Sequence, residues 1–135
     1  FMSDHGFDPD DRDDIKYIED PELAYVMLRY RQCHDFWHTL TGLETSVLGE
    51  LGLKWLELIQ TGLPMTALSA TVGSLRLTDQ ERTILMSHYL PWAIKVGQKA
   101  SPLMNVYYEE EFGTNLHELR ERMGIDAAPV IIAHK

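Results

Sequence analysis

Cysteine, long apolar runs and basic side chains are all scarce in this 135-residue sequence. Cys33 is the single cysteine, so no disulfide can form within the chain, which is typical of a reducing compartment. The uncharged segment 61–75 is interrupted by two glycines and a proline and is shorter than a membrane span. These absences exclude a disulfide framework and predict that no helix crosses a membrane.

Acidic residues outnumber basic ones by 21 to 12, but the excess is local. Residues 1–22 hold nine acidic side chains against two basic ones, so the rest of the chain is nearly neutral. Such a body has no basic stripe to neutralise phosphates, and we expect no nucleic-acid partner. We assign residues 1–19 to a flexible acidic arm. A calcium loop beginning at Asp8 is disfavoured, because Asp13 stands where an EF-hand needs glycine.

The length and a hydrophobic content of 44% fit one domain with a sizeable core. We place the helical domain at residues 20–124 and a C-terminal tail at residues 125–135. The chain begins with Phe1 and shows no signal or transit peptide. We therefore expect it to be a piece of a longer protein.

Apolar residues recur every three or four positions through most of the domain, which is the period of an amphipathic helix. We predict helices near residues 21–41, 45–61, 64–72, 78–94 and 114–123. Asp20 and Gly42 are expected to bound the first helix, and Pro91 should kink or divide the fourth. The sequence therefore predicts an all-α fold, a single helical domain of five or six helices.

The most informative pattern is HDxxH-x11-E, formed by His34, Asp35, His38 and Glu50. At about 100° per residue, the two histidines lie roughly 40° apart on a helix, with Asp35 close enough to converge on the same ion. Glu50, about one turn into the next helix, could complete the shell. Two imidazoles and carboxylate oxygens suit zinc, iron or manganese. The same residues could instead form a hydrogen-bonded core network or a solvated polar face.

Other chemistries fit this pattern poorly. A zinc peptidase of the HExxH type needs Glu between the two histidines as general base, and this chain has Asp35. A phosphohydrolase with a His-Asp doublet needs a further histidine upstream, and only His5 in the acidic arm precedes the motif. A Cys33–His34 nucleophile is also disfavoured, because adjacent helical residues point about 100° apart. We expect Cys33 to be a packed thiol.

The uncharged segment 63–75 is the second informative feature. Its larger apolar residues could line a groove for an isoprenoid chain or rest on a membrane, although a buried core helix would have the same pattern. The lipid-contact candidates are Leu63, Met65, Leu68, Val72 and Leu75. Elsewhere, we expect Trp92 and His88 to be core residues.

Along nearly all of its length the chain resembles the coenzyme Q (ubiquinone) biosynthesis protein four family. The motif HDxxH-x11-E agrees without a substitution at His34, Asp35, His38 and Glu50. Its flanks agree as well, at residues 7–12, 17–25, 29–33, 36–37, 60–65, 89–93 and 103–109. The joint match of motif and flanks makes the resemblance specific.

The resemblance implies a mostly α-helical protein, peripheral to the matrix side of the mitochondrial inner membrane, or to the cytoplasmic membrane face if bacterial. It implies a divalent metal, zinc first with iron or manganese as alternatives, held by the four motif residues, which are also the catalytic ones. The implied reaction is oxidative decarboxylation of a polyprenylated 4-hydroxybenzoate, in which hydroxyl replaces carboxyl at ring carbon one. The implied partners are this prenylated lipid, the membrane surface and other ubiquinone biosynthesis enzymes.

The family's helical N-terminal part has no counterpart in this sequence. We expect its absence to leave an apolar surface, and we therefore predict a homo-oligomer. Two functional hypotheses remain. In the first, the chain is an enzyme whose metal keeps a position open for substrate. In the second, it is a non-catalytic lipid-binding scaffold that organises the biosynthetic enzymes and whose metal is structural.

Overall fold

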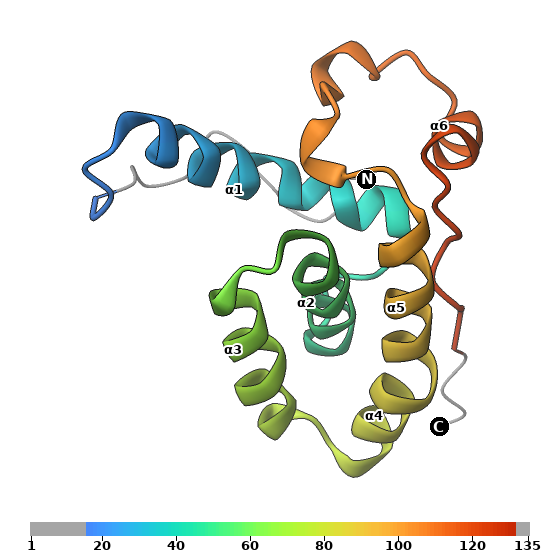
Figure 1. Cartoon of the computed structure of the whole chain (residues 1–135). Coiled ribbons are helices and arrows are strands. Elements are labelled where there is room, and N and C mark those ends of the chain that lie inside the picture. The colour runs from blue at the N-terminus through green and yellow to red at the C-terminus, as the bar shows by residue number, and fades with distance from the viewer. Residues whose placement is uncertain (1–15, 132–135) are drawn as a thin grey trace.

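The computed structural model of the chain describes residues 16–131 and is built from helices (Figure 1). The α-helices in this range are α1 (Pro21–Thr41), α2 (Val47–Thr61), α3 (Pro64–Gly73), α4 (Asp79–Ile84), α5 (Leu90–Lys99) and α6 (Leu116–Met123). Short 3-10 turns cover Ser74–Arg76, Leu103–Asn105 and Tyr108–Glu110, and a π turn covers Leu85–Tyr89. No strand occurs between residues 16 and 131, so the all-α prediction is confirmed.

Helix α2 lies in the middle of the body, with α3 and α5 packed against it (Figure 1). Helix α1 runs across one end of this group, and α6 lies beyond α1 and α5 on the outer side. The core lies where α1, α2 and α5 meet, and its fully buried side chains include Trp37, Leu53 and Val96. Because α2 is covered on several sides, several of its side chains lie in the interior, including Leu53, Leu56 and Glu57.

The two ends of α1 follow the residues that the sequence marked. The Asp20 side chain accepts hydrogen bonds from the amides of Glu22 and Leu23 and so caps the first turn. Gly42 ends the helix at φ 73°, a left-handed conformation that suits glycine best. Both predicted boundaries of α1 are therefore confirmed.

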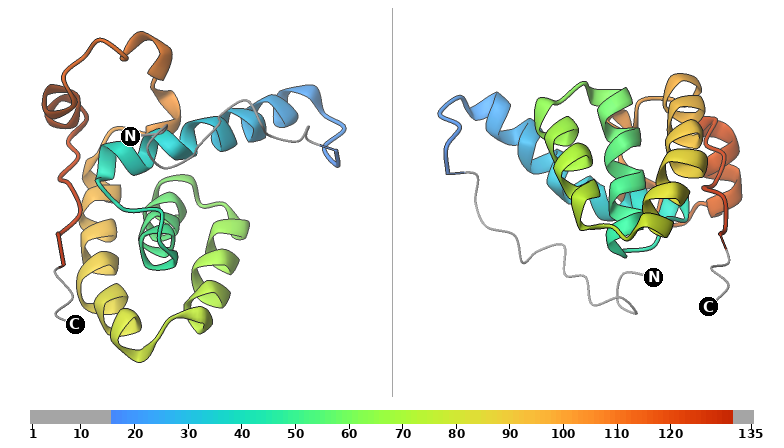
Figure 2. Two further views of the ribbon diagram at one scale, coloured as in Figure 1. Left: turned by 180° about the vertical axis from the view of Figure 1, so that it is seen from behind. Right: turned by 90° about the horizontal axis from the view of Figure 1, so that it is seen from below.

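The fourth predicted helix is divided before its proline. A capping box between Thr78 and Glu81 begins α4 as expected, and the chain then widens into the π turn before α5 starts at Leu90. Pro91 lies in the first turn of α5, where its missing N–H costs little. The interruption thus lies in the π turn just before Pro91 and not at the proline itself, and α5 follows this turn without a gap (Figure 2).

The N-terminal half of α1 extends beyond the rest of the body (Figures 1 and 2). Leu23 and Val26, which continue the apolar stripe of the helix, remain 60% and 51% exposed, whereas Cys33 and Trp37 are completely buried. Only the C-terminal half of α1 is therefore part of the core. The expectation of a packed thiol at Cys33 is confirmed.

Other expectations have mixed outcomes. Trp92 is buried as expected, but His88 is exposed on the π turn, so its assignment to the core is wrong. Most of the acidic arm assigned to residues 1–19 lies outside the described residues. From residue 16 to residue 131, no helix has both the length and the apolarity needed to cross a membrane.

Candidate metal centre

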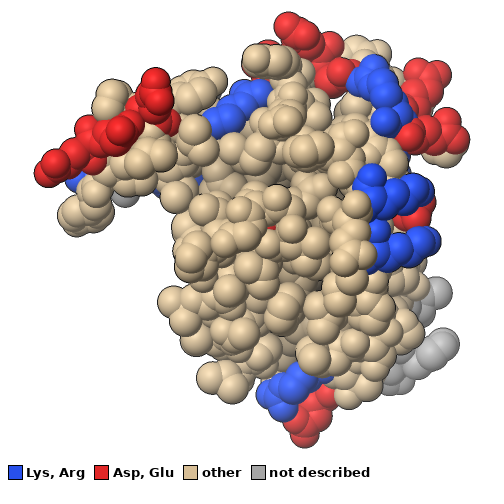
Figure 3. All heavy atoms as spheres, viewed as in Figure 1, with Lys and Arg blue, Asp and Glu red and all other residues tan. Residues whose placement is uncertain are grey.

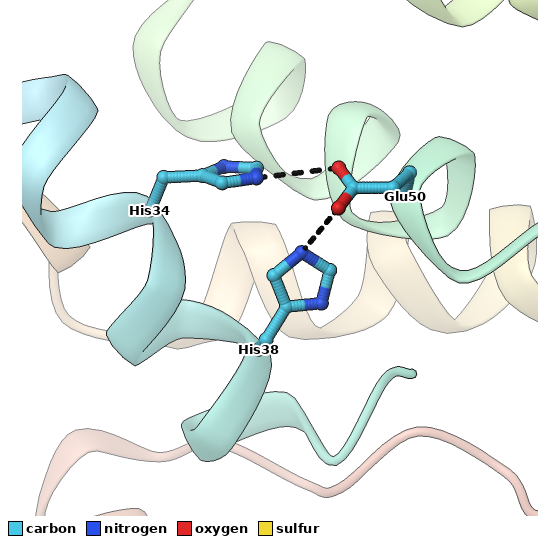
Figure 4. A group of neighbouring side chains, drawn as sticks. All are labelled: His34, His38 and Glu50. Carbon is cyan, nitrogen blue, oxygen red and sulfur yellow. Dashed lines mark hydrogen bonds and ion pairs between the residues drawn. The ribbon is translucent and has the colours of Figure 1, made fainter. Parts of the chain in front are cut away.

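Two histidines of α1 and one glutamate of α2 converge at the centre of the interface between these helices (Figure 4). Nε2 of His34 lies 3.2 Å from Oε2 of Glu50, and Nε2 of His38 lies 3.0 Å from Oε1 of the same carboxylate. One possible ligand atom from each residue lies within 4.8 Å of the others. Because His34 and His38 are one helical turn apart, α1 presents both rings to the same carboxylate.

The second nitrogen of each histidine is already bound to an acceptor. Nδ1 of His38 donates to the carbonyl of Leu43 over 3.0 Å, and Nδ1 of His34 donates to the carboxylate of Glu57 over 2.6 Å. In a neutral imidazole the Nε2 atom then carries a lone pair and no hydrogen. Both Nε2 lone pairs therefore face the carboxylate of Glu50.

Lone pairs that face a carboxylate at such distances need positive charge between them. Nε2 of His38 is buried, and in the described part of the chain its close polar neighbour is Oε1 of Glu50 at 3.0 Å, which can only accept, so a neutral His38 has no hydrogen-bond partner there. Leaving such a polar atom without a partner costs about 1–3 kcal/mol. A divalent cation among the three groups would satisfy it, and imidazole nitrogen and carboxylate oxygen are both suitable ligands. The donor set thus fits a metal ion.

The pKa values of these groups reflect how close their partners lie. Burial acts to raise the pKa of Glu50, but the bonds to His34 and His38 outweigh it and hold that pKa well below the usual range. Burial acts to lower the pKa of His34, yet its bonds to Glu50 and Glu57 raise it. The same close contacts thus lower the pKa of Glu50 and raise that of His34.

One side of the centre is accessible to solvent. The side chain of His38 is completely buried and that of His34 is 13% exposed, whereas the side chain of Glu50 is 37% exposed. A catalytic site keeps one coordination position for water or substrate, whereas a structural site is closed by protein ligands. Access from the Glu50 side is the arrangement that a catalytic centre needs.

Glycine is required beside Glu50. A Cβ atom at Gly49 would lie 2.0 Å from the carbonyl oxygen of Glu44, so no side chain fits there without a backbone shift. At the other end of the site, Arg120 of α6 donates to the carbonyls of Thr39 and Leu40 in the last turn of α1. Close packing at Gly49 fixes the start of α2, and Arg120 fixes the end of α1.

Asp35, the remaining residue of the motif, is not part of the converging group. Asp35 is only 2% exposed and is therefore buried on α1, the helix that carries His34 and His38. The structure thus brings together three of the four motif residues.

A largely apolar pocket of about 640 Å³ lies between the exposed half of α1, the end of α2 and the turn at Leu103–Asn105. Its walls include Leu23, Val26, Met27, Tyr30, Leu63 and Met104. The hydroxyl of Tyr30 donates to Glu57, which in turn accepts from His34. The pocket wall and the metal centre therefore share a hydrogen-bonded chain of three residues.

The proposed lipid-contact residues fall into two groups. Leu63 lines this pocket. Met65, Leu68, Val72 and Leu75 are 49% to 76% exposed on α3 and the turn after it. The alternative of a helix buried along its apolar face does not hold, because the buried residues of α3 are Thr66 and Ala70. The face shown in Figure 3 is almost free of charge over α3.

The family described as "Coenzyme Q (ubiquinone) biosynthesis protein Coq4" matches residues 1–129. The chain belongs to this family. It is similar to the mitochondrial ubiquinone biosynthesis protein COQ4 homolog of Nematostella vectensis, with 51% identity over 95% of this chain and 63% of the relative. The homolog of Drosophila melanogaster is 46% identical over 93% of this chain and 47% of the relative. The resemblance inferred from the motif is thereby confirmed.

The fold is also similar to that of a protein whose crystal structure is known. A crystal structure of a protein from Nostoc punctiforme, assigned to ubiquinone biosynthesis, superposes with a TM-score of 0.72 over 84% of this chain and 56% of that one. At 24% identity this similarity supports the fold alone. The chain spans about half to just under two thirds of the length of the curated relatives described above.

One residue of the site was missed by the sequence interpretation. Glu57 is completely buried, although glutamate is rarely so unless it is paired. It lies seven residues, or two turns, after Glu50 and directly follows the buried Leu56. A lone carboxylate on the same helical face as a metal-ligand candidate was the available signal.

Proposed function

We propose that this chain acts in ubiquinone biosynthesis and binds a divalent metal ion through His34, His38 and Glu50, with Asp35 as a further candidate ligand. The observation that carries the proposal is the approach of both Nε2 atoms to one carboxylate, at 3.2 Å from His34 and 3.0 Å from His38. Zinc is the first candidate, and iron or manganese would suit the same ligands. Family membership supports the pathway.

The proposed reaction replaces the carboxyl group at ring carbon one of a polyprenylated 4-hydroxybenzoate by hydroxyl. The bond from the ring to the carboxyl carbon breaks, carbon dioxide leaves, and a ring carbon–oxygen bond forms. With water as oxygen donor, two protons and two electrons are released, so an oxidant of the dioxygen or quinone class must accept the electrons. A bound metal ion would supply electrostatic stabilisation of the substrate's carboxylate or phenolate oxygen.

The protein's own residues would prepare the site for this chemistry. Leu43 and Glu57 hold the imidazoles with Nε2 turned inward, so no reorientation is needed when a ligand arrives. The accessible side of Glu50 provides a path for the head group. Lys54, whose ammonium group lies near Tyr30 and Glu57, adds positive charge beside the centre.

For the prenyl tail, we propose contact with the apolar pocket at Leu63 and with the exposed side chains of α3. An isoprenoid chain buries well against apolar atoms, and charges that would need desolvation are absent from α3. The exposed face formed by Met65, Leu68, Val72 and Leu75 suits a membrane surface, which would place the protein peripherally on the inner membrane of the mitochondrion. The mitochondrial names of the curated relatives support this location.

The test combines metal content with turnover. Protein purified without chelators should contain about one divalent ion per chain, and a short-chain prenylated hydroxybenzoate should release carbon dioxide when an oxidant is supplied. Metal without turnover in the presence of the oxidant and of the other biosynthetic enzymes would contradict the enzymatic proposal. Protein that takes up no divalent ion would contradict the metal site itself.

The second candidate function is a lipid-binding scaffold with a structural metal, in contact with other ubiquinone biosynthesis enzymes. The exposed apolar surface on α1 and α3 favours it, because patches of this kind usually find a partner. Light scattering should show a dimer or larger oligomer at micromolar concentration. A monomer that stays monodisperse without detergent would contradict self-association through this surface.

A further inference from the structure

Glu57 links the candidate metal centre to the buried side of α2. It is completely buried, and its Oε1 atom accepts a 2.6 Å hydrogen bond from Nδ1 of His34. Its Oε2 atom accepts from the hydroxyl of Tyr30 and, over 2.7 Å, from the ammonium group of Lys54. Both oxygens are therefore engaged, and each points in a fixed direction.

A buried carboxylate is costly unless its charge and its lone pairs are both satisfied. Lys54 alone could compensate the charge of Glu57, and its side chain is 21% exposed, so that ammonium group is partly solvated. The hydrogen bond to His34 is not needed to compensate the charge of Glu57, but it affects the tautomer of His34. A carboxylate only accepts hydrogen bonds, and Glu57 lies closer to Nδ1 of His34 (2.6 Å) than Glu50 lies to Nε2 (3.2 Å). Glu57 therefore favours the hydrogen of His34 on Nδ1, which leaves Nε2 to bind a cation.

The two histidines of the site are held in different ways. Nδ1 of His38 donates to the backbone carbonyl of Leu43, which carries only a partial charge, whereas Nδ1 of His34 donates to a full negative charge. An anionic partner makes the imidazole a more basic ligand and fixes the plane of the ring. His34 should therefore be the stronger of the two nitrogen ligands, and that strength should come from Glu57.

We infer that Glu57 is a positioning residue for a divalent cation: it fixes the tautomer and orientation of His34, while Tyr30 and Lys54 prevent its carboxylate from rotating. This inference rests on the metal site proposed above. The hydrogen bonds from Tyr30 to Glu57 and from Glu57 to His34 also connect the wall of the apolar pocket to the candidate metal centre.

The experiment compares four variants by metal affinity and by stability. Glu57→Gln keeps the shape but removes the charge, and Lys54→Met removes the countercharge. The double variant Lys54→Met/Glu57→Gln has neither charge. Tyr30→Phe is the matched control, because it removes one hydrogen bond to Glu57 and leaves the bond to His34 in place.

We expect Glu57→Gln to weaken zinc binding by about 10–100-fold in a chelator competition, as loss of an outer-shell partner typically does. The visible absorption of the cobalt-substituted protein should shift, since its ligand geometry changes. Tyr30→Phe should weaken binding less than Glu57→Gln. In the double variant the melting temperature of the metal-free protein should recover towards that of the wild type, whereas zinc affinity should stay low.

The outcomes separate this inference from the metal site on which it rests. If the wild type binds zinc and Glu57→Gln binds it equally well, Glu57 is only an interior ion-pair partner, and the inference fails while the metal site stands. If zinc affinity recovers together with stability in the double variant, the effect acted through the fold, and the inference fails. Wild-type protein that binds no zinc, cobalt, iron or manganese overturns both.

Discussion

Helix α1 has one apolar stripe but two different halves. In the C-terminal half, Trp37 and Leu40 are at most 2% exposed, and the two histidines of the candidate metal centre lie between turns that are locked into the core. In the N-terminal half, Leu23 and Val26 continue the stripe and are 60% and 51% exposed. The same periodicity thus produces a buried half, where α2 and α5 cover α1, and an exposed apolar surface, where they do not.

The largest effect should come from the buried half itself. Replacing His38 by alanine removes a buried candidate ligand. Metal affinity should therefore fall by more than about 100-fold, the upper end of what loss of an outer-shell partner costs. Zinc content after desalting, measured by mass spectrometry, tests this. His88→Ala is the control, because it removes an exposed imidazole outside the site. Unchanged zinc content in His38→Ala would exclude this residue as a ligand.

A matched pair of leucines tests the difference between the halves directly. Leu40→Ala should lower the free energy of unfolding by about 2–5 kcal/mol, because it leaves a cavity in the core. Leu23→Ala, at an exposed position of the same helix, should change it by about 0.5 kcal/mol or less. Urea unfolding followed by circular dichroism measures both. Equal losses would show that the N-terminal half is packed in solution.

The exposed apolar surface of α3 can be tested with a single charge. Leu68→Asp should weaken binding of a long-chain prenylated hydroxybenzoate far more than binding of the tail-less compound, because a carboxylate would have to be desolvated beside the tail. Ser69→Asp places the same charge on the neighbouring exposed residue and serves as control. Equal losses for both ligands, measured by calorimetry, would assign α3 another role.

The smallest effect concerns the acid side of the stability profile. Burial acts to raise the pKa of Glu57, but His34 and Lys54 hold it below its ordinary value of 4.5. A carboxyl group whose pKa is lower in the folded state stabilises the fold above the unfolded pKa, and this contribution is lost as the pH falls through the folded pKa. As the pH is lowered from about 4.5, the urea concentration at the unfolding midpoint should therefore decrease more steeply for the metal-free wild type than for Glu57→Gln.

A variant of an exposed carboxyl group provides the control for this profile. Glu118→Gln, on the outer surface of α6, should reproduce the wild-type curve. If Glu57→Gln also reproduces it, Glu57 does not stabilise the metal-free protein through its charge.

Local chemistry made most of the fold predictable. Caps and the period of three to four residues gave most helix ends to within about two positions, and two of the small differences arise at caps that were not recognised. The helix predicted at residues 78–94 is the exception, because its helical region continues to Lys99. Helix α2 begins at Val47 because Ser46 caps it, and α6 begins at Leu116 because Asn115 does. Which part of an apolar stripe becomes buried depends on distant helices, and periodicity carries no information about them.

The candidate site was predictable only where its residues share a helix or follow a known motif. Spacing places His34 and His38 on one face, and the family motif adds Glu50. The contribution of Tyr30, Lys54 and Glu57 could not be predicted, because their meeting depends on how α1 crosses α2. A single charged residue among leucines is usually assigned to the surface, and only the packing shows it to be interior.

Gly49 has a consequence for how variants of this protein should be interpreted. It contributes no atom to the candidate centre, yet any side chain there would meet the carbonyl of Glu44 at 2.0 Å and displace the turn that carries Glu50. In a mutational screen, substitutions at Gly49 would therefore be grouped with substitutions of the metal ligands. A library variant at this position should act as a loss of metal binding while every candidate ligand remains in the sequence.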